Sequence, residues 1–125
     1  ITDIRKRVEK GTSGGVSLVG TLASLAGSAL IALLASLFTA NWSLFPLITL
    51  AGLAGSLFDS FLGATVQALY FCPKDNKETE KHPLHTCGTE TIHLRGWKWL
   101  TNDWVNFACG AVGALIGTLL VKLLA

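Results

Sequence analysis

One acidic residue within a long apolar stretch is the first position at which this sequence could do chemistry. Between Gly11 and Cys72 the only formal charge is Asp59. An ionisable side chain within a membrane span is expensive, so by default it marks a functional site. Gly, Ser, Asp, Gly and Gln occupy positions 52, 56, 59, 63 and 67, a spacing that places them on one helix face. The alternative role for Asp59 is structural, through a hydrogen bond to a neighbouring helix.

A glycine-rich segment offers backbone amides that could hold a phosphate. Residues 11–17 read Gly-Thr-Ser-Gly-Gly-Val-Ser and open an apolar run. The N–H groups at a helix N-terminus, together with the helix dipole, favour anions, and glycine lets a ligand approach the backbone. No lysine follows the glycines, so the segment is not a P-loop. A flexible connection is the alternative interpretation.

The last apolar run begins with a third polar group, which contains Asn102, Asp103 and Asn106. Asp103 could join Asp59 in supplying oxygen ligands for Mg²⁺, which prefers carboxylates together with substrate phosphates. Two acids, amides and a glycine-rich helix start are suitable parts for phosphoryl transfer, in which catalysis is mainly positioning and charge neutralisation. Equally, Asp103 could complement the helix dipole and Asn102 could cap the helix.

A polar region between the second and third apolar runs contains thiols and imidazoles. Cys72, His82, His85 and Cys87 follow the pattern C-x9-H-x2-H-x-C, which is not a standard zinc-finger spacing. Unpaired thiols and surface histidines in a reducing compartment are the simpler interpretation. Cys109 lies in the last apolar run, where packing is its expected role.

Three apolar runs must position these groups, and the composition indicates a membrane protein. Of the 125 residues, 50% are hydrophobic and 14% are charged, which excludes an ordinary soluble domain and a disordered tail. Runs at about 16–38, 43–63 and 104–121 are each long enough to cross a bilayer. We therefore predict an all-α polytopic membrane protein fragment with about three transmembrane helices and one polar loop at 71–103. Residues 1–125 are expected to form the C-terminal membrane portion of a larger protein.

The basic residues assign a side of the membrane to the polar groups. With three spans, nine of the ten lysines and arginines fall on one side, and only Lys122 falls on the other. The positive-inside rule makes the basic side cytoplasmic, or stromal in a plastid. All three polar groups are expected to reach this face. The residues expected to bind phosphate or substrate there are Gly11, Thr12, Ser13, Gly14, Gly15, Ser60, Gln67, Asn102 and Asn106.

Three motifs occur in an order and spacing that resemble a known family. They are Gly11-Thr-Ser-Gly-Gly-Val-Ser-Leu-Val-Gly-Thr21, Gly55-Ser-Leu-Phe-Asp59-Ser-Phe-Leu-Gly63-Ala-Thr-Val-Gln67 and Asn102-Asp-Trp-Val-Asn106. The chain is similar to the integral membrane family that includes plant phytyl-phosphate kinase and animal transmembrane protein nineteen. The resemblance implies the activity of the plant members, which convert phytyl phosphate to phytyl diphosphate with a nucleoside triphosphate, preferentially CTP.

The chain departs from the pattern of this family in two places. The family has several further spans on the N-terminal side, with a motif resembling Asp-Thr-Trp-Ala-Ser-Glu that these 125 residues lack. Bacterial relatives carry what resembles Cys-Pro-x-Cys and His-x-Cys-Gly, whereas this chain has Cys72-Pro-Lys-Asp75 and His85-Thr-Cys87-Gly. A complete zinc site would need Asp75 or His82 as a substitute ligand. Cys72, His85 and Cys87 are therefore interpreted as a partial or vestigial zinc site.

The residues and the resemblance together favour an enzyme that acts on isoprenoid phosphates. We predict part of a membrane-embedded isoprenyl-phosphate kinase that transfers a phosphoryl group from CTP or another nucleoside triphosphate to a prenyl monophosphate. Asp59 and Asp103 would be its catalytic residues and would hold Mg²⁺. Its expected partners are an isoprenoid lipid in the membrane and the N-terminal half of the same protein, with no nucleic acid. The alternative is a non-enzymatic membrane protein, such as a transporter subunit or an assembly factor packed through glycine stripes.

Overall fold

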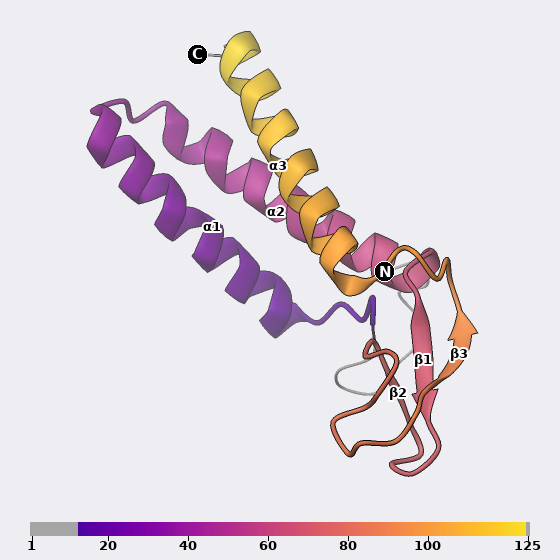
Figure 1. Ribbon diagram of the computed structural model, residues 1–125. Helices are drawn as coiled ribbons and strands as arrows, with labels where there is room; N and C mark the ends of the chain where they lie inside the picture. The colour runs from indigo at the N-terminus through magenta and orange to yellow at the C-terminus, as the bar shows by residue number, and fades with distance from the viewer. Residues whose placement is uncertain (1–12, 125) are drawn as a thin grey trace. The chain divides into compact units, whose positions relative to one another are not determined.

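Three long helices and a small antiparallel sheet make up the described part of the chain. The computed structural model describes residues 13–124 (Figure 1). The elements in chain order are α1 (Leu18–Thr39), α2 (Leu44–Thr65), β1 (Leu69–Cys72), β2 (Lys77–Thr79), β3 (Ile92–Arg95) and α3 (Asn102–Leu124). The prediction of an all-α fold is therefore wrong, because the polar region predicted as a loop contains a three-stranded sheet.

The chain divides into two compact units. One, called here the helical unit, comprises Val16–Asp59 and α3 from Phe107 onward. The other, called the sheet unit, comprises Ser60–Asn106 and the segment that ends at Gly15. The helices α2 and α3 contribute residues to both units.

The three helices match the predicted spans to within three residues at each end, and each is long and apolar enough to cross a membrane. The Ser17 hydroxyl caps α1 by accepting a hydrogen bond from the Gly20 N–H at 3.0 Å. The helix stops at Ala40, which has a left-handed conformation with φ of 51°. The Asn41 side chain then accepts a hydrogen bond from the Ser43 N–H at 3.1 Å, which tightens the turn that leads into α2.

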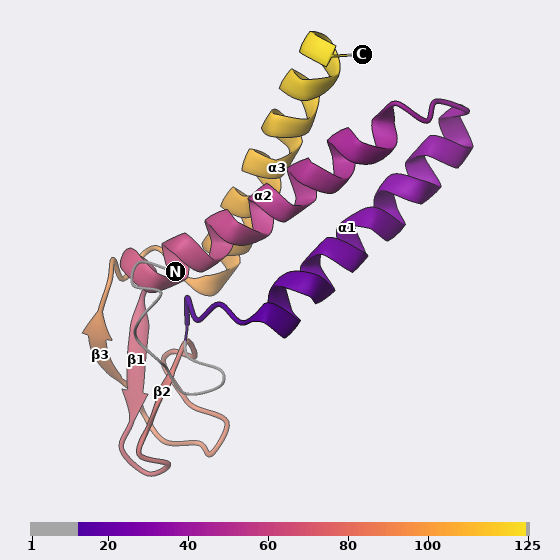
Figure 2. The same ribbon diagram turned by 180° about the vertical axis from the view of Figure 1, so that it is seen from behind.

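Small residues bring the helices of the helical unit close together. In both views α1 and α2 run side by side in opposite directions (Figure 1, Figure 2). A Cβ atom placed on Gly52 would lie 2.5 Å from the Ser28 hydroxyl, and one placed on Gly55 would lie 2.9 Å from the Cys109 carbonyl oxygen on α3. Such backbone approach through glycine and serine is typical of helix packing in membranes.

Large apolar side chains of the helical unit point outward. Phe38 is 90% exposed, Val19 is 78% exposed and Phe107 is 69% exposed. A soluble protein rarely leaves apolar surface of this extent in contact with water, whereas lipid tails solvate such side chains well. The pattern of exposure therefore agrees with helices that lie in a bilayer.

The central strand of the sheet contributes half of the buried apolar residues of the sheet unit. The strand order is β2-β1-β3, and β1 pairs antiparallel with both neighbours. The buried apolar residues of this core are Ala68, Leu69, Tyr70, Cys72, Leu100 and Val105. The core is small, so other contacts must help to hold the unit together.

The sheet begins with a strand-forming run that precedes a tight turn. Residues 69–72 read Leu-Tyr-Phe-Cys, and aromatic side chains suit a half-buried pleated surface. Asn76 lies in the turn that follows, with φ of 49°, a conformation that asparagine tolerates better than most residues. Charge and apolar run length, which identify membrane spans, do not detect strands of three or four residues.

Candidate functional site

Two segments far apart in the sequence meet at the end of α2 in the sheet unit. The Ser13 hydroxyl donates to the Gly63 carbonyl oxygen at 3.3 Å, and Gln67 Oε1 also lies within its reach at 3.5 Å. Gly14 has φ of 75°, and a Cβ atom there would collide with the Ala64 backbone. Only glycine accepts both this conformation and this approach. The contact brings together three of the predicted binding residues, Ser13, Gly14 and Gln67.

Arg95, the last residue of β3, contacts the same C-terminal end of α2. Arg95 Nη1 donates to the Ala64 carbonyl oxygen and Nη2 to the Gly63 carbonyl oxygen, both at 3.2 Å. A cation is favourable there, because the last carbonyl groups of a helix carry partial negative charge. Gly96, with φ of 82°, lies against the Gln67 carbonyl group so closely that no side chain fits. Arg95 was not among the predicted site residues, and its position in the sequence carries no signal of this contact.

Gln67 is the most informative polar residue of this region. It is 3% exposed, and its Nε2 has no hydrogen-bond partner among the residues that the structure describes. A buried N–H donor without an acceptor destabilises a protein by about 1–3 kcal/mol. A hydrogen-bond acceptor such as an anionic oxygen would satisfy this donor. We call Ser13, Gly14, Gly63 and Gln67 the amide cluster.

Asp59 lies on α2 within the helical unit. It is half-buried, and its side chain neighbours the Cys109 thiol on α3. One turn earlier, Gly55 allows the Cys109 carbonyl group to approach α2. The charged side chain therefore has a partner helix beside it, which agrees with both the functional role and the structural alternative. Ser60 follows as the first α2 residue of the sheet unit and is half-buried.

The polar residues at the start of α3 are placed in its first turns. Asn102 is the first residue of the helix, and Asp103 is the acidic residue of its first turn, where it complements the helix dipole. Asp103 and Asn106 are exposed. Asp59 and Asp103 belong to different units, so their pairing as Mg²⁺ ligands stays a prediction. Of the predicted phosphate-binding segment, the structure describes Ser13, Gly14 and Gly15, whereas Gly11 and Thr12 lie outside the described residues.

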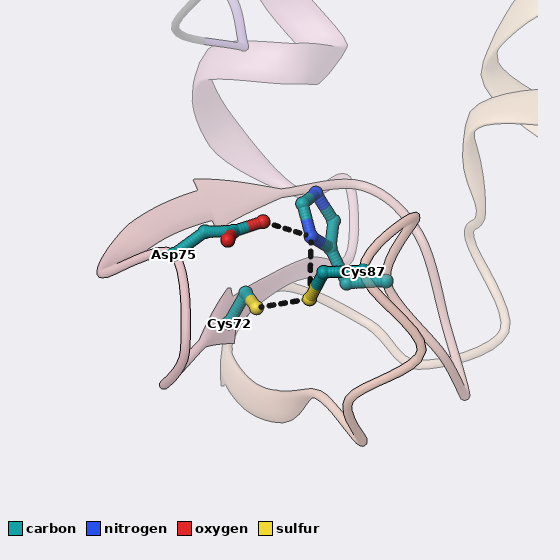
Figure 3. A group of neighbouring side chains, drawn as sticks. Cys72, Asp75 and Cys87 are labelled. Carbon is teal, nitrogen blue, oxygen red and sulfur yellow. Dashed lines mark hydrogen bonds and ion pairs between the residues drawn. The ribbon is translucent and has the colours of Figure 1, made fainter.

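A second group of side chains converges near the turn between β1 and β2. One atom each from Cys72, Asp75, His85 and Cys87 can bind a metal, and these four atoms lie within 4.8 Å of one another. The two sulfur atoms are 3.4 Å apart. His85 Nδ1 lies 3.4 Å from Cys87 Sγ and 2.8 Å from Asp75 Oδ2. Figure 3 shows Cys72, Asp75 and Cys87 pointing toward a common centre. We call these four residues the thiol cluster.

Two neighbours set the chemistry of the Cys87 thiol. Hydrogen bonds with Thr89 and then with His85 lower the pKa of Cys87 to about 7. A thiol with this pKa is partly ionised at neutral pH, and the thiolate is the form that binds metals. Of the two substitute ligands considered from the sequence, Asp75 joins the thiol cluster. His82 instead stacks on Tyr70, with ring centroids 4.5 Å apart.

Comparison with known proteins places the chain in a family. The integral membrane protein family DUF92 matches residues 1–114. Protein PGR of Arabidopsis thaliana is 40% identical, over 82% of this chain and 38% of its own length. An uncharacterized membrane protein of Methanocaldococcus jannaschii is 42% identical, over 46% of this chain and 24% of its own length. No solved structure matches the chain significantly.

These matches settle the resemblance that the three motifs indicated. The chain spans well under two thirds of both relatives, 38% of one and 24% of the other. The family match, in contrast, covers most of the 125 residues. The membrane nature of the family agrees with the three apolar helices of the structure. The chain therefore belongs to the integral membrane protein family DUF92.

Proposed function

We propose that this chain is part of a membrane-embedded kinase that phosphorylates an isoprenyl monophosphate. The observation that carries the proposal is the buried Nε2 of Gln67 in the amide cluster, a donor that has no hydrogen-bond partner among the described residues. Preorganised amide donors of this kind stabilise phosphate oxygens. Family membership supports a substrate that lies in the membrane, and the resemblance to plant phytyl-phosphate kinase supports its isoprenoid class.

Each part of the reaction falls to particular residues. The amide cluster would hold a phosphate group, with Asn102 and Asn106 as further donors. Asp59 and Asp103 are carboxylates, the oxygen donors that Mg²⁺ prefers, and they would hold this ion. Bound Mg²⁺ neutralises negative charge on phosphate oxygens. The isoprenoid tail would lie in lipid among the spans, and CTP or another nucleoside triphosphate would arrive from the cytoplasmic or stromal side.

The chemistry of this transfer asks little of the protein beyond positioning. A phosphate oxygen of the prenyl monophosphate attacks the γ-phosphorus of the nucleotide, and the bond from that phosphorus to the bridging oxygen breaks. The products are prenyl diphosphate and a nucleoside diphosphate. Because a phosphate monoester is already ionised near pH 7, its oxygen needs no general base. Amide donors and two carboxylates are therefore the types of group that this transfer requires.

Membranes that contain the full-length protein test this proposal. They would receive radiolabelled prenyl monophosphates of several chain lengths, Mg²⁺ and CTP or ATP, and the prenyl diphosphate would be quantified. Asp59→Asn is expected to abolish turnover, and Gln67→Met is expected to lower it about tenfold or more, because each removes an interaction with charge in the transition state. Lys98→Gln, a change at an exposed residue, is the matched control and should retain full activity.

Two outcomes would overturn the proposal. One is the absence of diphosphate product at every chain length when size-exclusion chromatography shows that the protein is folded. The other is flux of a solute in proteoliposomes without consumption of nucleotide, which would favour the transporter alternative. Full activity of Asp59→Asn in a functional kinase would contradict the role of Asp59 alone.

A further inference from the structure

The thiol cluster has no role in the proposed phosphoryl transfer. Cys72 and Asp75 come from the end of β1 and the turn after it, whereas His85 and Cys87 come from the connection between β2 and β3. We propose that the thiol cluster binds one structural Zn²⁺ ion through Cys72 Sγ, Asp75 Oδ2, His85 Nδ1 and Cys87 Sγ.

The spacing of the four atoms suits tetrahedral coordination. Ligands at zinc bond lengths of about 2.0–2.3 Å stand about 3.2–3.8 Å from one another at the corners of a tetrahedron. The two sulfur atoms are 3.4 Å apart and the nitrogen lies 3.4 Å from Cys87 Sγ, both within this range. The contact of 2.8 Å between His85 Nδ1 and Asp75 Oδ2 is shorter. All four atoms lie within 4.8 Å of one another, so modest shifts of the side chains would bring each of them to ligand distance.

The position of the imidazole distinguishes a metal site from a catalytic arrangement of the same residues. In a Cys-His-Asp triad, the thiol and the carboxylate bind the two opposite nitrogens of the imidazole ring. Here Cys87 Sγ and Asp75 Oδ2 both approach the same nitrogen, Nδ1 of His85. A common cation is the natural centre of such an arrangement. The cluster is therefore a set of ligands rather than a nucleophile and its base.

The donor types and their burial favour a structural zinc ion. Two thiolates with one imidazole and one carboxylate suit zinc, and four protein ligands leave no open position for a substrate. Cys72 is completely buried, and the His85 side chain is 8% exposed. The Asp75 side chain is 33% exposed, so it closes the site on the solvent side.

A metal ion would also stabilise the sheet unit. Its apolar core is small, and small units commonly need a metal ion or disulfides to remain folded. The ion would tie the turn after β1 to the loop that contains His85 and Cys87. Because β1 begins at Leu69, two residues after Gln67, the ion would also hold in place the strand next to the amide cluster.

Metal content of the purified full-length protein tests this inference. The protein would be isolated in detergent without chelators, and zinc would be measured by inductively coupled plasma mass spectrometry. About one zinc ion per chain is expected, and Co²⁺ exchanged into the site should show the visible spectrum of a tetrahedral thiolate complex. Cys87→Ser should lose the metal. Cys109→Ser and His82→Gln are matched controls, a thiol and an imidazole outside the cluster, and both should keep it.

Variants of Asp75 keep the test decisive if the loss of a cysteine prevents folding. Asp75→Ala should weaken zinc binding about tenfold or more, because second-shell partners alone contribute 10–100-fold and a direct ligand contributes at least as much. Asp75→Cys should keep zinc at full occupancy, since thiolate is a preferred ligand.

Three results would overturn the inference: no stoichiometric metal in the folded protein, a Cys72–Cys87 disulfide in its place, or equal zinc content in Cys87→Ser and the parent protein. None of these results bears on turnover of prenyl phosphates, so failure here is distinguishable from failure of the proposed kinase.

Discussion

In the helical unit, helices approach through small residues and leave large apolar side chains on the surface. In the sheet unit, a small core is surrounded by directed polar contacts. Phe38 and Val19 are mostly exposed in the first unit, whereas Arg95 and Ser13 reach across the second to bind backbone carbonyl groups. Lipid solvates the apolar surface of the helical unit, so its internal contacts need only close approach. Water competes for the exposed polar groups of the sheet unit, so that unit depends on particular hydrogen bonds and backbone conformations.

The largest loss of stability is expected at Gly96, the glycine of the sheet unit whose backbone contacts Gln67. Gly96→Ala should lower the free energy of unfolding by about 3 kcal/mol or more, because it adds a collision to an unfavourable positive φ. Gly88 also has positive φ, of 78°, but a Cβ atom there meets no atom of the described residues within 4 Å. Gly88→Ala should therefore lower it by about 1–2 kcal/mol. Thermal unfolding in detergent measures both, and equal losses would contradict the importance of the Gln67 contact.

In the helical unit, the sensitive positions should be those of close backbone approach. Gly55→Leu should lower the free energy of unfolding by about 2 kcal/mol, because its side chain would push α2 away from the Cys109 carbonyl group. At Gly110, on the neighbouring helix, an added Cβ atom has no neighbour within 4 Å in the part of the chain that the structure describes. Gly110→Leu should leave stability nearly unchanged in the same unfolding assay. If Gly110→Leu is as harmful as Gly55→Leu, close approach is not what holds these helices together.

The Arg95 guanidinium group contacts the end of α2. Its substitution tests whether directed hydrogen bonds stabilise the sheet unit. Arg95→Met keeps an apolar stem but removes two hydrogen bonds to carbonyl oxygens, so the free energy of unfolding should fall by about 1.5 kcal/mol. Arg95→Lys should recover only part of this loss, because an ammonium group cannot donate in the same fork. Chemical denaturation followed by tryptophan fluorescence would show the order. Lys98→Met, at an exposed position, is the control and should have no effect.

The smallest effect is expected where a local hydrogen bond starts a helix. Ser17→Ala should lower stability by about 1 kcal/mol, because the Gly20 N–H loses its acceptor. Ser17→Asp should restore most of this, since aspartate is an equally good cap. Hydrogen exchange at the Gly20 amide reports the change directly. Unaltered exchange in Ser17→Ala would show that lipid or water replaces the cap without cost.

Local sequence patterns predicted the helical unit well. Runs of about 20 mostly apolar residues identify spans because each backbone hydrogen bond of a helix is made within the run itself. The observed helices accordingly begin and end within three residues of the predicted positions. The same patterns missed the sheet, since strands of three or four residues are stabilised by partners elsewhere in the chain.

The sequence alone determined that this chain belongs in a membrane, where its three spans lie and which polar residue types accompany them. It also offered Cys72, His85 and Cys87 as metal ligands, but left the choice between Asp75 and His82 open. Only the tertiary structure decided that choice, as it decided the contact of Ser13 with Gly63 across 50 positions and of Arg95 with Ala64 across 31. Apolar character and helix-forming tendency are properties of neighbouring residues, whereas the meeting of distant residues depends on how the whole chain turns back on itself.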